Sequence, residues 1–163
     1  MVWSKIWKVK TPPKVNTFVW KLMLDSLPTF ANLRHRGISV DSKCPFYNEQ
    51  EENNTHLFLL CPFSRACWHG TLLAIHSSDF CNISIQQWLT GAINNHNSKD
   101  YISMNYLQAI FTTLWTIWNH RNRVVHEGIS PNPMRVILMV QSLSCRYNRT
   151  RMHSQTNPTQ FSS

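Results

Sequence analysis

Glycine and long apolar runs are both scarce in this sequence. Only four glycines occur in 163 residues, which argues against a turn-rich β-sandwich. No apolar run approaches the roughly 20 residues that a membrane-spanning helix needs. The first ten residues alternate tryptophan and lysine and lack the apolar stretch of a secretory signal. The sequence therefore predicts an intracellular protein of the nucleus or cytoplasm that neither contacts a membrane nor is secreted.

Clustered carboxylates are also lacking. Polymerase and ribonuclease H chemistry needs grouped Asp and Glu side chains that hold two divalent metal ions. The four aspartates here are widely separated, and the only close group is Glu49, Glu51 and Glu52. No cysteine, serine or histidine lies in the local pattern of a known nucleophile elbow. We therefore expect no enzymatic activity and no catalytic residues.

Hydrophobic residues make up 42% of the chain, which is enough for a sizeable core. They recur with the period of buried helices from residue 13 to the Leu27-Pro28 pair, over 62–75, 85–93 and 107–118, and again after Asn132-Pro133. Thr29 is placed as a helix N-cap, and Gly37 and Gly128 as helix stops. The fold class is therefore mostly α, and the predicted core includes Val15, Phe18, Leu22, Leu33, Phe58, Trp68, Leu107, Phe111, Leu114, Trp115 and Trp118.

Three residues are candidates for binding a metal: Cys44, His56 and Cys61. Thiolate and imidazole are ligands that zinc prefers, and a structural zinc site uses four ligands in a tetrahedron. A loop that supplies Cys44 and a helix start that supplies the other two could bring three ligands together. The alternative is that the cysteines are small buried hydrophobic residues and the histidine caps a helix.

The run from Cys44 to Cys61, with Tyr47 and His56 between them, resembles the zinc-binding domain that follows reverse transcriptase in plant LINE-type retrotransposons. Farther along, residues 114–122 resemble the helix that precedes the RNase H-like domain of such elements. The resemblance covers most of residues 3–128. The flanking segments that share it are Trp3–Trp7, Pro13–Val15, Phe18, Trp20, Leu27–Thr29, Asn32–Leu33, Arg36–Ile38 and Trp68.

This resemblance implies a small helical domain around a zinc knuckle of the pattern Cys-x2-Cys followed by His-x4-Cys. Tyr47 occupies the position of the second cysteine. A phenol is a poor zinc ligand at neutral pH because its pKa is about 10. We therefore expect an incomplete zinc site that recruits water, Cys67 or His69. The ligands that carry over are Cys44, His56 and Cys61.

Basic residues outnumber acidic ones by sixteen to eight and gather in two regions. Residues 1–43 hold eight basic and two acidic side chains, and residues 120–151 hold six arginines and one glutamate. Aromatic rings interleave with these charges, a mixture that can grip phosphates and stack on unpaired bases. The alternative is that the tryptophans are core and the charges are solvated. The predicted contacts to RNA or DNA are Lys5, Lys8, Lys10, Arg121 and Arg123.

Four regions follow from these patterns. We predict a reverse-transcriptase zinc-binding-like domain at residues 1–93, a linker at 94–100, a C-terminal helical extension at 101–151 and a disordered tail at 152–163. The predicted function is a non-catalytic, retrotransposon-derived module associated with nucleic acid, or a fragment of a reverse transcriptase polyprotein. The alternative is a small helical protein-interaction scaffold or a relic without a function.

Overall fold

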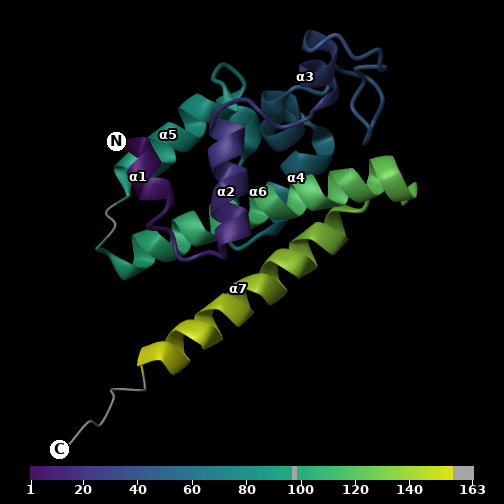
Figure 1. Ribbon diagram of the computed structural model, residues 1–163. Helices are drawn as coiled ribbons and strands as arrows, with labels where there is room; N and C mark the ends of the chain where they lie inside the picture. The colour runs from purple at the N-terminus through teal and green to yellow at the C-terminus, as the bar shows by residue number, and fades with distance from the viewer. Residues whose placement is uncertain (97–98, 156–163) are drawn as a thin grey trace, which may run out of the picture.

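The computed structural model describes residues 1–96 and 99–155, and helices form its architecture (Figure 1). Within these ranges the β pairing is limited to an isolated antiparallel bridge between Lys43 and Glu51. No helix of the described chain is both long and apolar enough to cross a bilayer. The predicted mostly α fold is confirmed. The described helices are α1 (Val2–Ile6), α2 (Pro13–Met23), α3 (Phe30–His35), α4 (Pro62–Gly70), α5 (Ile85–Asn95), α6 (Tyr101–Glu127) and α7 (Pro133–Gln155), with a π-helical turn at His56–Leu60 and a 3-10 turn at Ser77–Phe80.

The long helix α6 organises the molecule. Its 27 residues span about 40 Å at 1.5 Å per residue. The Asp100 side chain accepts hydrogen bonds from the first amides of the helix, and Gly128 ends it with a φ of 68° that glycine adopts without strain. Helix α2 packs on α6, and α7 returns along its other side (Figure 1). Arg151 near the end of α7 donates to Asn105 near the start of α6.

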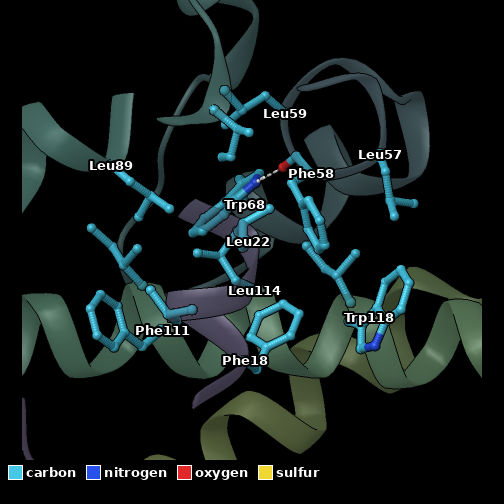
Figure 2. Packing of buried hydrophobic residues seen from close by; sticks show 14 of the residues in the cluster. Phe18, Leu22, Leu57, Phe58, Leu59, Trp68, Leu89, Phe111, Leu114 and Trp118 are labelled. Carbon is cyan, nitrogen blue, oxygen red and sulfur yellow. Dashed lines mark hydrogen bonds between the residues drawn. The ribbon is translucent and has the colours of Figure 1, made fainter. Parts of the chain in front are cut away.

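The core lies between α2, α4, α5, α6 and the π-helical turn (Figure 2). Phe18 of α2 contacts the rings of Phe58, Trp115 and Trp118 at centroid distances of 5.9, 5.5 and 6.3 Å. Trp68 of α4 is fully buried, and its Nε1–H donates to the Phe58 carbonyl oxygen at 2.6 Å (Figure 2). This bond satisfies the only polar atom of a large buried ring, so the ring can occupy the core without a desolvation penalty.

Most of the predicted core is confirmed. Trp115 is half-buried and packs against the core, whereas Leu33 is half-buried and lies outside the core cluster, so its assignment to the core was wrong. Side chains from both sides of residues 94–100 share this one core, so the C-terminal extension packs on the first 93 residues. Asn94 and Asn95 belong to α5, while residues 97–98 of the predicted linker lie outside the described residues. Helix α7 continues past Arg151 to Gln155, and residues 156–163 of the predicted tail lie outside the described residues.

The end of α2 differs from the prediction. The helix stops at Met23, ahead of the predicted stop at Leu27-Pro28. Asp25 takes a left-handed conformation with φ 53°, and its N–H donates to the Leu22 carbonyl while the Ser26 N–H donates to the Lys21 carbonyl. These two bonds form a Schellman motif with aspartate in the position that glycine usually fills. Because an aspartate stands there, no glycine signalled the stop.

Candidate metal centre and candidate nucleic-acid interface

Cys44 lies in a tight turn of the loop that follows α3. Its N–H donates to the Gln50 carbonyl at 2.6 Å, and its own carbonyl accepts the Asn48 N–H at 2.8 Å. Asn48 has a φ of 58°, a conformation that asparagine tolerates better than most residues. The bridge between Lys43 and Glu51 closes the base of this turn. The loop therefore fixes the Cys44 backbone through its own hydrogen bonds.

His56 and Cys61 are the first residue of the π-helical turn and the residue that follows it. The Cys61 N–H donates to the His56 carbonyl at 2.7 Å, a bond between residues five apart. In a regular α-helix, such residues point about 140° away from each other. The wider π turn reduces this separation and lets both side chains face Cys44. Turns of this kind are rare in proteins as a whole, but many of those that occur lie at functional sites. Helix α4 starts at Pro62, immediately after Cys61.

The predicted convergence of these three side chains is confirmed. One ring nitrogen of His56 and the Sγ atoms of Cys44 and Cys61 all lie within 4.8 Å of one another. The two Sγ atoms are 3.7 Å apart. Two thiolates bound at 2.3 Å to one tetrahedral zinc ion would lie about 3.8 Å apart. The spacing of the two sulfur atoms therefore suits a zinc ion. Both cysteines are fully buried and His56 is 6% exposed, so such an ion would be largely shielded from solvent.

The surroundings stabilise one negative charge on the pair of sulfur atoms, and that charge lies on Cys44. The hydrogen bond from the Cys61 thiol holds the pKa of Cys44 well below its ordinary value, despite the opposing effect of burial, and His56 and backbone N–H groups lower it further. The same contact, with burial, raises the pKa of Cys61. The pair therefore shares one proton, and a bound cation would replace that proton.

Backbone amides support both sulfur atoms in the same way. The backbone N–H groups of Phe46 and Tyr47 lower the pKa of Cys44, and those of Phe63 and Ser64 act in the same direction on the pKa of Cys61. In each case the donors are two and three residues after the cysteine. Hydrogen bonding to a charged form stabilises it. Two buried thiolates with matching amide donors are therefore favourable here once a cation balances their charge.

The residues present fit a zinc ion with three protein ligands and one open position. Nδ1 of His56 is buried and has no hydrogen-bond partner among the described residues. Buried polar atoms rarely lack a partner in folded proteins. Tyr47 is 49% exposed and lies outside the group of three. Cys67 points its sulfur to the Pro133 carbonyl at 4.0 Å, and His69 pairs with the His76 ring, so neither joins the group. Water remains the candidate for the fourth position.

A buried ion pair beside the knuckle was not predicted. Glu52 is fully buried and Arg121 is 3% exposed. Their contacts are bidentate: Nε of Arg121 donates to Oε2 at 2.7 Å and Nη2 donates to Oε1 at 2.5 Å. Glu52 also accepts the Phe30 N–H at 2.8 Å, and its carbonyl accepts the Ala31 N–H at 3.1 Å. This one glutamate therefore joins the knuckle loop to α3 and to α6.

The expectation that Arg121 contacts nucleic acid is wrong. Its guanidinium lies over the rings of Phe30 and Trp118, at 4.6 and 5.0 Å from their centroids, and it is held by Glu52. Burial raises the pKa of Glu52, while the arginine opposes this effect. A side chain that compensates a buried carboxylate cannot also reach a phosphate. Glu52 is likewise not part of an exposed acidic group, although Glu49 and Glu51 are exposed.

The other predicted nucleic-acid contacts lie on the surface. Lys8 and Lys10 are exposed, and Lys5 is half-buried with its Nζ 3.3 Å from Oδ1 of Asn94. Arg123 is exposed and pairs with Glu127 on the same helix at 3.1 Å. The structure thus places the three lysines together near α1 and separates them from Arg123, which lies toward the end of α6.

Comparisons with known proteins are consistent with a zinc-binding site. Residues 1–68 match the family described as zinc-binding in reverse transcriptase, so the resemblance to a reverse-transcriptase zinc-binding domain is confirmed over this region. The chain is also 22% identical over 116 residues to a protein of Arabidopsis thaliana that carries the provisional name ribonuclease H protein. The match covers 71% of this chain and 18% of the length of that relative. No solved structure matches the chain.

Proposed function

We propose that this chain is a non-catalytic, zinc-binding module of a plant LINE-type reverse transcriptase polyprotein, and that it holds single-stranded nucleic acid. The family match and the three converging ligands support the zinc-binding part. The group that could hold a metal among the described residues consists of two cysteines and a histidine, whereas the two-metal chemistry of polymerases and nucleases uses clustered carboxylates.

The observation that carries the nucleic-acid proposal is the exposure of two tryptophans at the N-terminus. Trp3 and Trp7 are 39% and 50% exposed, and they lie four residues apart on and beside α1. An exposed tryptophan ring offers a flat face on which an unpaired base can stack. Because Lys8 and Lys10 are exposed in the same segment, the rings could stack on bases while the ammonium groups contact phosphates. The core interpretation fits Trp118, which is buried, and does not fit these two.

A second basic surface adjoins this segment. A cleft of about 680 Å³ is lined by Lys10, Thr11 and Pro12 on one side and by the end of α7 on the other. Arg146, Tyr147 and Arg151 contribute two guanidinium groups and a ring to that side. The two basic regions, far apart in the sequence, therefore meet at one place. A single strand that stacks on Trp7 could continue along this cleft.

Binding of a labelled 20-nucleotide RNA or DNA strand, followed by fluorescence anisotropy across a salt series, tests the proposal. Affinity should fall steeply with salt because each phosphate contact releases condensed counterion. The double variant Lys8→Glu/Lys10→Glu should bind more weakly and show a shallower salt dependence. The matched control is Lys43→Glu/Arg65→Glu, two exposed residues that lie outside both the N-terminal segment and the cleft.

Absence of binding at about 50 mM salt, where phosphate contacts are strong, would overturn the proposal in favour of a protein-interaction scaffold. Equal weakening in the two double variants would show that only net charge matters, and not this surface.

A further inference from the structure

A groove of about 650 Å³ runs between α2, α3 and α6, on a surface that the proposed function does not use. Its floor contains apolar side chains that are only half-buried: Phe30, Leu33, Trp115 and Val125. Concave, mostly apolar sites with a few polar groups around them are typical of binding sites.

The rim of the groove is positively charged. Lys14 and Lys21 of α2 and His126 of α6 are exposed along it, and none of the described residues that line it is acidic. Lys14 and Lys21 are seven residues apart, or two helical turns, so they stand about 10 Å apart along α2. Carboxylates seven residues apart on a partner helix would have the same separation.

The aromatic rings of the groove are poorly placed to stack on a nucleobase. Nζ of Lys14 lies 5.8 Å from the centroid of Trp115, and Phe18 meets Trp115 edge to face at 5.5 Å. Arg121 lies over both Phe30 and Trp118. A base would have to displace a cation that Glu52 holds in place. These contacts favour an occupant that packs aliphatic side chains against the rings.

We propose that this groove binds an acidic amphipathic helix of a partner protein. The apolar side chains of that helix lie on Trp115, Phe30 and Leu33, at the i, i+3, i+4 and i+7 spacing of helix-in-groove recognition. Its carboxylates pair with Lys14 and Lys21. This site is separate from the surface around α1, so the two proposals can fail independently.

The test uses a dye-labelled 16-residue peptide with leucines in one helical stripe and glutamates seven residues apart beside it. A peptide of the same composition in scrambled order is the control. The wild-type chain should bind the amphipathic peptide and not the scrambled one. Lys14→Glu/Lys21→Glu should weaken binding by about tenfold, since two favourable pairs become repulsive. The matched reversal Arg65→Glu/Arg149→Glu should leave it unchanged.

A second variant separates shape from charge. Thr17 lies between the two lysines on α2 and lines the groove, so Thr17→Trp should fill it and abolish peptide binding without changing the charge. Circular dichroism verifies that each variant is folded. Failure of the wild type to bind the peptide, or binding that ignores both groove variants, would overturn the proposal. Loss of oligonucleotide binding in the Lys14/Lys21 variant, without peptide binding by the wild type, would instead make the groove part of the nucleic-acid surface.

Discussion

Replacing Arg121 with alanine should leave the Glu52 carboxylate buried without its cation. Both side chains are almost completely inaccessible, at 3% and 0% exposure, and two short hydrogen bonds join them. Removing one partner of such a pair costs about 3–5 kcal/mol. A domain of this kind has a total stability of about 5–15 kcal/mol. Loss of this one guanidinium should therefore remove a large share of the free energy of unfolding.

The assay is urea denaturation followed by tryptophan fluorescence. Arg123→Ala is the matched control, because Arg123 pairs with Glu127 on the surface of the same helix with both side chains about half exposed, and such pairs contribute about 0.3–0.5 kcal/mol. In a double-mutant cycle, Glu52→Gln with Arg121→Met should cost less than the sum of the single changes. If Arg121→Ala destabilises the protein no more than Arg123→Ala, the buried pair does not join the knuckle to α6 as described.

Three further changes have defined outcomes. Tyr47→Cys should complete the tetrahedral site, and zinc titration should then show tighter binding together with a higher melting temperature in the presence of zinc; Asn48→Cys, one residue along, should give neither gain. Trp7→Ala should weaken binding of single-stranded nucleic acid by about tenfold, since one base stack contributes about 1–3 kcal/mol. The control variant Trp20→Ala should bind as the wild type does. Equal losses of affinity in the two variants would count against the α1 surface. Burial, with the charges of Arg123 and Arg135, lowers the pKa of His120 from its ordinary value of 6.5, and its Nε2 accepts the Asn132 N–H at 3.1 Å. The free energy of unfolding, measured by urea melts in the presence of chelator, should therefore be highest above pH 6.5 and fall as the pH drops through the lowered pKa. His120→Phe should flatten this pH profile.

Local signals in the sequence predicted the features that depend on neighbouring residues. The Thr29 side chain accepts the Asn32 N–H as an N-cap, and Gly37 and Gly128 have the positive φ values of helix stops. The spacing from Cys44 to Cys61 left two interpretations open, and the resemblance to a zinc knuckle predicted that the three ligands meet. The π-helical turn that brings His56 and Cys61 onto one side has no simple sequence signature, so it was not predicted.

The ion pair between Glu52 and Arg121 could not be read from a local pattern, because its members are 69 residues apart. One signal was available. Arg121 follows Leu114 and Trp118 at seven and three residues, so it continues the buried stripe of α6 inward. Arg121 was predicted to lie on the surface because of its charge, although its position on this apolar stripe indicated burial. An arginine on an apolar helical stripe indicates a buried acid elsewhere in the chain.

Zinc binding by the site of Cys44, His56 and Cys61 is best tested by measuring metal stoichiometry. The protein is stripped with chelator under reducing conditions, titrated with zinc, and analysed by mass spectrometry for bound metal. The wild type should take up one equivalent of zinc, and Cys44→Ser should take up none. Cys81→Ser changes an exposed cysteine outside the site and should behave as the wild type. Zinc uptake that is absent in the wild type, or equal in all three proteins, would contradict a metal centre at the knuckle.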